Sequence, residues 1–137
     1  MSDDSKQSNP GNDPRSDILD ERYPARRIIG IIADKWTPIV LYCLASGTRH
    51  FGQMEKRIPG LSRKMLTQVL RRLEANGLVT RRVLRAVPPK TDYELTPLGR
   101  QLYVPVAMLC DWALKNETTL DRIDAYRSQF VRNADWK

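Results

Sequence analysis

The sequence has little that would support catalysis, a metal site or a disulfide framework. Its 137 residues include two cysteines, Cys43 and Cys110, and a single histidine, His50. Two thiols are too few for a disulfide framework or a structural zinc site, and one histidine offers no convincing nucleophile–base pair. The sequence also contains no glycine-rich phosphate loop and no metal-ligand spacing. We therefore expect no enzyme activity, no metal and no cofactor.

Long apolar runs are also missing. The longest, "IIGIIA" and "IVLYCLA", are far shorter than the roughly 20 residues that a membrane-spanning helix needs. The chain opens with the polar and acidic stretch "MSDDSKQSNPGNDPRSD", which does not have the form of a signal peptide. These features predict a cytoplasmic protein without a membrane partner.

Positive charge is in excess, and the excess is confined to one segment. The formal net charge is +7 and the sequence pI is about 9.7. Between Arg49 and Arg100 there are 12 basic and 4 acidic residues, whereas the rest of the chain has 11 basic and 12 acidic residues. This distribution favours a polyanionic partner that meets the middle segment.

The chain divides into one domain and two tails. Residues 1–20 are rich in Ser, Asp, Asn, Gly and Pro, a composition that cannot bury enough apolar surface to order itself, so we expect a disordered tail. Residues 21–131 are predicted to form the folded domain, and residues 132–137 a short C-terminal tail.

Two helices should form the first part of the domain. Pro24 opens the first, which carries Ile28 on its apolar side. In "TPIVLYCLASG", Thr37 is expected to cap the second helix and Gly47 to end it. This helix is apolar nearly all round, so we expect it to be the most buried. Cys43 lies within it and should be a buried thiol that acts as a small hydrophobe.

The stretch "SRKMLTQVLRRLEANGLVTRR", residues 62–82, predicts a helix followed by a strand. Ser62 can cap this helix and Gly77 can end it. A short helix and a Pro-Gly turn precede it, and a hairpin of "LVTRRV" and "DYEL" follows, with "LRAVPPKT" as its loop. This order predicts a mainly α (α+β) fold, a winged helix-turn-helix with a two-stranded β wing.

One face of the helix predicted over residues 63–75 is apolar, and the opposite face has side chains that suit DNA. Arg and Lys can bond phosphate or guanine, Gln can bond adenine, and the Thr methyl group can contact thymine. The contacts predicted from the helix are Ser62, Arg63, Lys64, Thr67, Gln68 and Arg71. Those predicted from the wing and adjoining backbone are Arg49, His50, Arg81, Arg82, Arg85, Pro88 and Lys90.

A charged helix face is often only solvated, but the basic hairpin next to it favours nucleic acid. Double-stranded DNA is favoured over RNA, because a helix fits the major groove and no sheet of exposed aromatic residues is expected. Two alternatives stay open. One is an architectural protein that coats DNA without sequence preference, and the other is an interaction module whose basic face meets an acidic protein.

The C-terminal part predicts two more helices. Thr96 and the proline after it should open a long helix, and a last helix is expected over about 120–130. An apolar stripe along the long helix is expected to serve the core or an interface: Leu98, Leu102, Val106, Leu109 and Ala113.

With these motifs the sequence resembles the HxlR family of bacterial, MarR-like winged-helix regulators. The resemblance runs over about residues 23–112 and is carried by "KWT", "IPGLSRKMLTQVLRRLEANGLV", "VPPKTDYELTPLG" and Trp112. It implies a transcription regulator that acts as a homodimer on two operator half-sites. We expect a repressor, because a repressor needs only tight placement over a promoter. The dimer contacts assigned on this basis are Ile28, Leu102, Val106, Leu109 and Trp112.

The sequence departs from the family at one informative position. Many members carry a cysteine just before the proline that opens the first helix, and several use it to sense oxidants or electrophiles. Here that position is Tyr23. Cys110 is the candidate redox residue in its place, and the effector, a small molecule or an electrophile, is left open.

Overall fold

A buried helix, α2 (Thr37–Ala45), lies at the centre of the fold in the computed structural model, which describes residues 20, 22 and 24–134. Val40 and Leu41 are completely buried, and Cys43 is 3% exposed, as expected. Tyr42 faces solvent, so α2 is not buried on every side. Helix α1 (Pro24–Ile32) precedes α2 and begins at the predicted proline.

The cap of α2 differs from the prediction. Thr37 is already the first residue of the helix, and the carboxylate that satisfies the free backbone N–H groups belongs to Asp34. Its Oδ1 atom accepts hydrogen bonds from the backbone nitrogens of Trp36 at 2.9 Å and Thr37 at 2.8 Å. The prediction that Thr37 caps α2 is therefore wrong, because an acidic side chain in the preceding turn reaches the same donors.

Helices α3 (Phe51–Arg57) and α4 (Arg63–Ala75) form the helix-turn-helix pair. The Ser62 hydroxyl accepts a hydrogen bond from the backbone nitrogen of Met65 at 3.1 Å, which confirms the predicted cap of α4. Gly77 has a φ of +72°, the left-handed conformation that ends a helix and favours glycine. The predicted apolar face of α4 is buried in the core: Leu66, Val69, Leu70 and Leu73.

An antiparallel hairpin of β1 (Val79–Leu84) and β2 (Lys90–Leu95) forms the wing. Strand β2 begins two residues before the predicted "DYEL". The wing is tied to both neighbouring helices through Thr96, whose hydroxyl donates to the carbonyl of Gly77 at 2.6 Å and accepts from the nitrogen of Gly99 at 3.0 Å. The end of α4 and the start of the next helix are thereby joined at the base of the wing.

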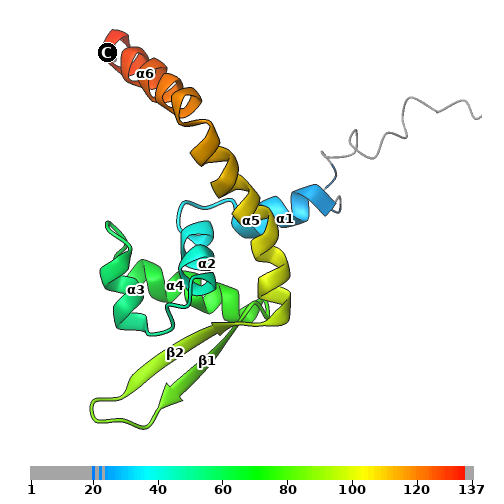
Figure 1. Ribbon diagram of the computed structural model, residues 1–137, viewed down its shortest axis with the longest axis vertical. Helices are drawn as coiled ribbons and strands as arrows, with labels where there is room; N and C mark the ends of the chain where they lie inside the picture. Colours follow the sequence, from blue (N-terminus) through cyan, green and yellow to red (C-terminus); the bar gives the residue numbers. More distant parts are fainter. Residues whose placement is uncertain (1–19, 21, 23, 135–137) are drawn as a thin grey trace, which may run out of the picture.

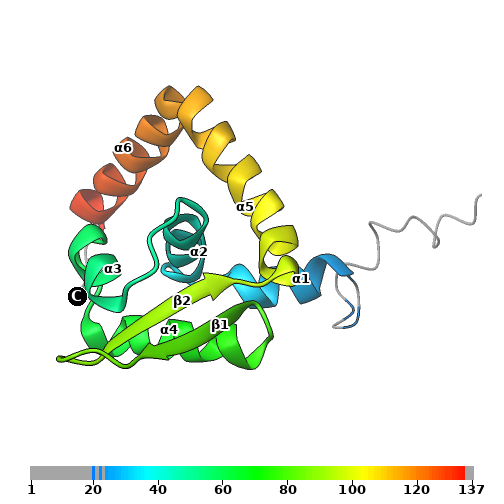
Figure 2. The ribbon, with the colours of Figure 1, turned by 60° about the horizontal axis from the view of Figure 1, so that its bottom comes forward.

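The long helix α5 (Pro97–Lys115) leads from the base of the wing past α2 to the last helix, α6 (Glu117–Asn133). Figure 1 shows α6 continuing beyond the end of α5, far from the wing, and Figure 2 shows that the two helices meet at an angle. None of the residues of α6 is buried. This helix extends into the predicted tail over 132–137, and the predicted tail over 1–20 lies outside the described residues apart from Asp20.

The apolar stripe predicted on α5 is divided between the core and the surface. Val106 is 1% exposed and sits in the core with Gly99 on the inner side of the helix. Leu98 and Leu109 instead face solvent. Val106 therefore serves the chain's own core and cannot make the interface contact that was assigned to it.

Within the part of the chain that the structure describes, no single helix is both long and apolar enough to cross a membrane. The pair α1 and α2 reaches that length and composition together, but the two helices meet at a bend of 82°.

Candidate nucleic-acid interface

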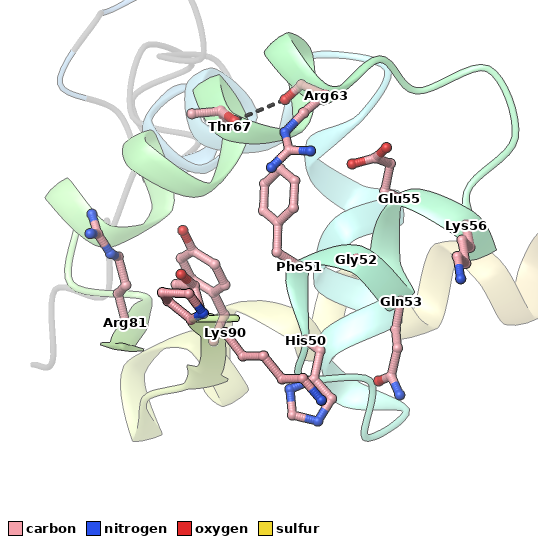
Figure 3. Close-up of a pocket in the computed structure, with 13 residues that line it drawn as sticks. His50, Phe51, Gly52, Gln53, Glu55, Lys56, Arg63, Thr67, Arg81 and Lys90 are labelled. Carbon is pink, nitrogen blue, oxygen red and sulfur yellow. Dashed lines mark hydrogen bonds between the residues drawn. The ribbon is translucent and has the colours of Figure 1, made fainter. Parts of the chain in front are cut away.

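A groove of about 660 Å³ opens between α3, α4 and the wing, and Figure 3 shows the side chains around it. Each of the three elements contributes positive charge to this groove. Its cationic residues are Lys56 from α3, Arg63 from α4, and Arg81 and Lys90 from the wing. One carboxylate, that of Glu55, also lines it. The groove therefore has a net positive charge that is suited to an anion.

The outward face of α4 is polar and carries predicted contact residues. At about 100° per residue, Lys64, Gln68 and Arg71 lie directly opposite the buried leucines of the helix, and all three are exposed. A helix in this position can enter a major groove with these side chains leading. Ser62, by contrast, has its hydroxyl engaged in the helix cap.

Arg63 and Thr67 lie on the side of α4 that faces the groove. The guanidinium of Arg63 is 5.3 Å from the centre of the Phe51 ring, within the range of a cation–π interaction. The hydroxyl of Thr67 donates to the backbone carbonyl of Arg63 at 2.8 Å, and both residues line the groove (Figure 3). The predicted helix contacts therefore fall into two groups: Lys64, Gln68 and Arg71 on the outward face, and Arg63 and Thr67 beside the groove.

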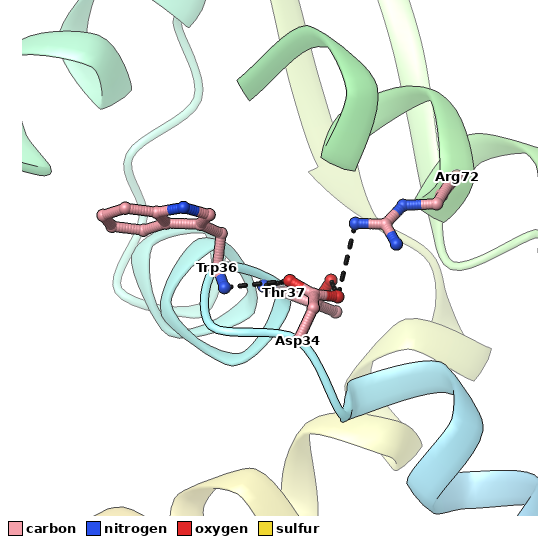
Figure 4. A network of polar contacts seen from close by, with 4 residues as sticks. All are labelled: Asp34, Trp36, Thr37 and Arg72. Carbon is pink, nitrogen blue, oxygen red and sulfur yellow. Dashed lines mark hydrogen bonds and ion pairs between the residues drawn. The ribbon is translucent and has the colours of Figure 1, made fainter. Parts of the chain in front are cut away.

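The opposite flank of α4 is tied to the turn between α1 and α2. Arg72 lies there, and its Nη2 atom is 3.3 Å from Oδ2 of Asp34 (Figure 4). Arg72 was not among the predicted contacts, and its neighbour Arg71 was. The pairing with Asp34 turns the guanidinium of Arg72 toward the protein's own surface.

The two adjacent arginines of the wing point to opposite faces of the hairpin, because side chains alternate along a strand. Arg81 is paired in register with Tyr93 and lines the groove. Arg82 is paired with Asp92 on the other face. Arg85 and Pro88 are exposed in the loop beyond the strands, where they are free to meet an extended partner.

His50 has a partner that the sequence did not reveal. Its Nδ1 atom contacts the carboxylate of Asp92, and the two residues also form an isolated β-bridge. The backbone nitrogen of Tyr93 donates to the carbonyl of Arg49 at 2.8 Å, directly alongside. These contacts fix the start of α3 to β2 across 42 residues of chain. No local pattern predicts such a pair.

Tyr93 also lines the groove. Burial raises the pKa of its phenol, the charge of Arg81 opposes that shift, and the charge of Glu74 adds to it. The net direction is upward, so the hydroxyl stays neutral near neutral pH and adds no negative charge to the groove.

The residues assigned to dimer contacts lie in different environments. Leu109 and Trp112 are exposed on α5, whereas Ile28 and Leu102 are half-buried. Cys110 is half-buried against the core and is the more accessible of the two free thiols. Among the residues that the structure describes, no group of three or more His, Cys, Asp or Glu side chains is placed to hold a metal ion.

The arrangement of α3, α4 and the basic hairpin defines a winged helix-turn-helix protein. Residues 31–121 match the HxlR-like helix-turn-helix family, and the chain belongs to that family. It is 37% identical over 107 residues to YdeP of Bacillus subtilis, an HTH-type transcriptional regulator, covering 78% of this chain and 84% of that one. The chain is therefore a transcriptional regulator with a helix-turn-helix DNA-binding fold.

Solved structures support the same assignment. The regulator YtfH of Salmonella typhimurium is similar with a TM-score of 0.67 at 35% identity, over 81% of this chain and 96% of that one. The redox regulator HypR in its reduced form is similar with a TM-score of 0.67 at 35% identity, over 72% of this chain and 98% of that one. The MarR-like winged-helix fold predicted from the sequence is confirmed.

Proposed function

We propose that this protein is a homodimeric repressor that binds a pseudo-palindromic operator in double-stranded DNA. The observation that carries sequence-specific binding is the outward face of α4. There Lys64, Gln68 and Arg71 are exposed together on a helix whose other faces are anchored in the core or paired. These are side-chain types that hydrogen-bond guanine and adenine edges.

A second copy of the chain would cover the apolar surface at the C-terminal end. Ile123, Tyr126 and Phe130 are 54%, 67% and 67% exposed and share one side of α6. Leu109 and Trp112 are also exposed, on the preceding helix α5. A set of large apolar side chains of this kind marks an interaction surface in a soluble regulator. Two-fold symmetry would then place the two copies of α4 in successive major grooves, about 34 Å apart.

Repression follows from placement alone. A dimer held across a promoter blocks it without any further contact, so tight placement is sufficient for repression.

Cys110 is our candidate for a thiol response, in place of the cysteine that Tyr23 replaces. Cys43 is 3% exposed, so a reagent would reach Cys110 first. An adduct on Cys110 would disrupt the packing of α5 against the core. Treating the protein with N-ethylmaleimide and then measuring operator binding tests this, and Cys110→Ser should abolish any response while Cys43→Ser should not.

The decisive experiment is a selection from random duplexes with the full-length protein, followed by anisotropy titrations. We expect an enriched pseudo-palindrome that survives unlabelled unrelated DNA by a factor on the order of a thousand. DNA from upstream of the protein's own gene is the first natural duplex to test. Binding without any enriched sequence would indicate a non-specific coat. Negligible binding near physiological salt would indicate a protein-interaction module.

A further inference from the structure

The geometry points to different roles for the residues of α4. Arg63 binds a DNA backbone phosphate in the groove and does not contact a base, and the ring of Phe51 positions its side chain. This inference rests on the proposed function and assigns roles within it. Arg63 and Gln68 are alike in sequence terms, since both are polar residues in the N-terminal half of one helix. The structure separates them.

The position of Arg63 on the helix is the first argument. Base edges at the floor of a major groove are reached by side chains that lead away from the protein. Arg63 is turned by about 100° from Lys64, toward Phe51 of α3. Its guanidinium lies over the face of Phe51 and borders the groove.

The charges across the groove are the second argument. Arg81 and Lys90 line it from the wing, Lys56 from α3 and Arg63 from α4, so three elements contribute cations to one groove (Figure 3). A phosphate carries charge and oxygen acceptors at every nucleotide, so cations that converge from separate elements suit the backbone and need no particular base. Glu55, on the α3 side, is the one carboxylate in the lining.

The ring of Phe51 orients the side chain of Arg63. A guanidinium over an aromatic face keeps its edge N–H groups free for a phosphate, while the ring restricts the long side chain. The hydrogen bond from Thr67 to the carbonyl of Arg63 reinforces the helix at the same point. Phe51 is thus a positioning residue that acts through Arg63 and does not itself touch the DNA.

The test compares the duplex enriched by selection with an unrelated duplex of equal length, both titrated over a range of salt. For Arg63→Ala we expect binding to both duplexes to weaken by the same factor, about tenfold, and the salt slope to fall by about one per subunit. The ratio of the two affinities should stay constant within about twofold. Arg122→Ala, which removes an exposed arginine on α6, is the matched control and should leave the slope unchanged.

The role of Phe51 is tested by a double-mutant cycle. Phe51→Leu keeps apolar volume without the aromatic face, so it should lower the salt slope in the parent chain and have no further effect in Arg63→Ala. Phe51→Tyr should restore the parent slope. An equal loss of affinity in both backgrounds, or no rescue by tyrosine, would show that Phe51 only supports the fold.

The experiment also distinguishes a failure of this inference from a failure of the proposed function. If Arg63→Ala brings the affinity ratio toward one while the salt slope stays constant, Arg63 reads a base and the inference is overturned, with the proposed function intact. Because Arg63 is an exposed residue, this variant should fold, so its result stands even where Phe51→Leu does not. If the unmodified protein enriches no duplex, the proposed function itself is overturned.

Discussion

The guanidinium of Arg72 lies 3.3 Å from the carboxylate of Asp34, and this contact joins α4 to the turn that connects α1 with α2. The same carboxylate accepts hydrogen bonds from the first backbone nitrogens of α2 and from the hydroxyl of Thr37. Asp34 therefore contacts both the central helix α2 and helix α4, and substitutions can test these two contacts separately.

Asp34→Ala should destabilise the protein more than Arg72→Ala does. The first removes the cap of α2, which typically costs about 1 kcal/mol, together with the ion pair. The second removes one partner of an exposed pair, whose contribution is about 0–1 kcal/mol. Urea unfolding of both variants, followed by circular dichroism, measures the difference. Equal losses would mean that the hydrogen bonds to α2 contribute little.

The contribution of Asp34 should also depend on pH. Partial burial raises the pKa of this carboxyl, but the hydrogen bonds from Thr37 and Trp36 and the charge of Arg72 outweigh it, so the pKa lies below its ordinary value of 3.8. A carboxyl with a lowered pKa in the folded state stabilises that state above its unfolded pKa and loses this contribution as the pH falls through the folded pKa.

The free energies of unfolding of the parent chain and of Asp34→Asn, measured at a series of pH values, test this dependence. Their difference should be constant near neutral pH and should shrink as the pH falls below about 4. A difference that does not change through this range would contradict the lowered pKa.

Adjacent arginines on α4 should differ in their effect on DNA binding. Arg71 is exposed on the outward face, whereas Arg72 is turned toward Asp34. We expect Arg71→Ala to weaken operator binding by about 1–3 kcal/mol, the usual cost of a lost base contact. Arg72→Ala removes the same charge and should change affinity by much less. Anisotropy titrations on the selected duplex decide this, and equal losses would show that only net charge matters.

Local chemistry explains why the sequence predicted the helix-turn-helix so well. The Ser62 cap, the left-handed Gly77 and the alternating wing each depend on neighbours a few residues away. The buried face of α4 follows from a clear contrast between apolar and charged positions. These features need no tertiary information.

The features that the sequence did not predict are those that depend on tertiary packing. Helix α5 carries apolar residues on several sides, so the predicted stripe includes Val106, which the fold buries together with Gly99, and also Leu98 and Leu109, which it leaves exposed. The contact of His50 with Asp92 spans 42 residues, and that of Arg63 with Phe51 joins two helices. Spacing along the chain carries no signal for either contact. The candidate site was therefore predicted as a list of residues, and the structure divided that list by direction.

Gly99, the glycine of α5, should not tolerate a side chain. A Cβ atom there would lie 2.1 Å from the backbone oxygen of Leu78 and 3.2 Å from a methyl carbon of Leu95. Because a backbone atom cannot move aside easily, Gly99→Ala should cost roughly 3 kcal/mol, the upper end of overpacking penalties. The matched control is Gly52→Ala on α3, where no heavy atom lies within 4 Å. Thermal and urea unfolding should show a large loss for the first and a neutral or slightly stabilising effect for the second.

Charge on the apolar side of α6 should separate the proposed dimer. Ile123 and Phe130 are exposed within one chain, so Ile123→Glu combined with Phe130→Glu should leave the monomer folded. Burying two carboxylates in an interface is costly, however, so the dimer should dissociate. Since two linked half-site contacts then become independent, operator affinity should fall by about a hundredfold or more.

Light scattering after size exclusion and anisotropy on the selected duplex measure the two effects of this double substitution together. Ser128→Glu, on the opposite side of the same helix and also exposed to solvent, is the control and should remain dimeric. A double variant that is still dimeric would place the interface elsewhere on the chain. One that is monomeric yet binds its operator with unchanged affinity would show that a single winged helix-turn-helix is sufficient, and would contradict the proposed pairing of half-sites.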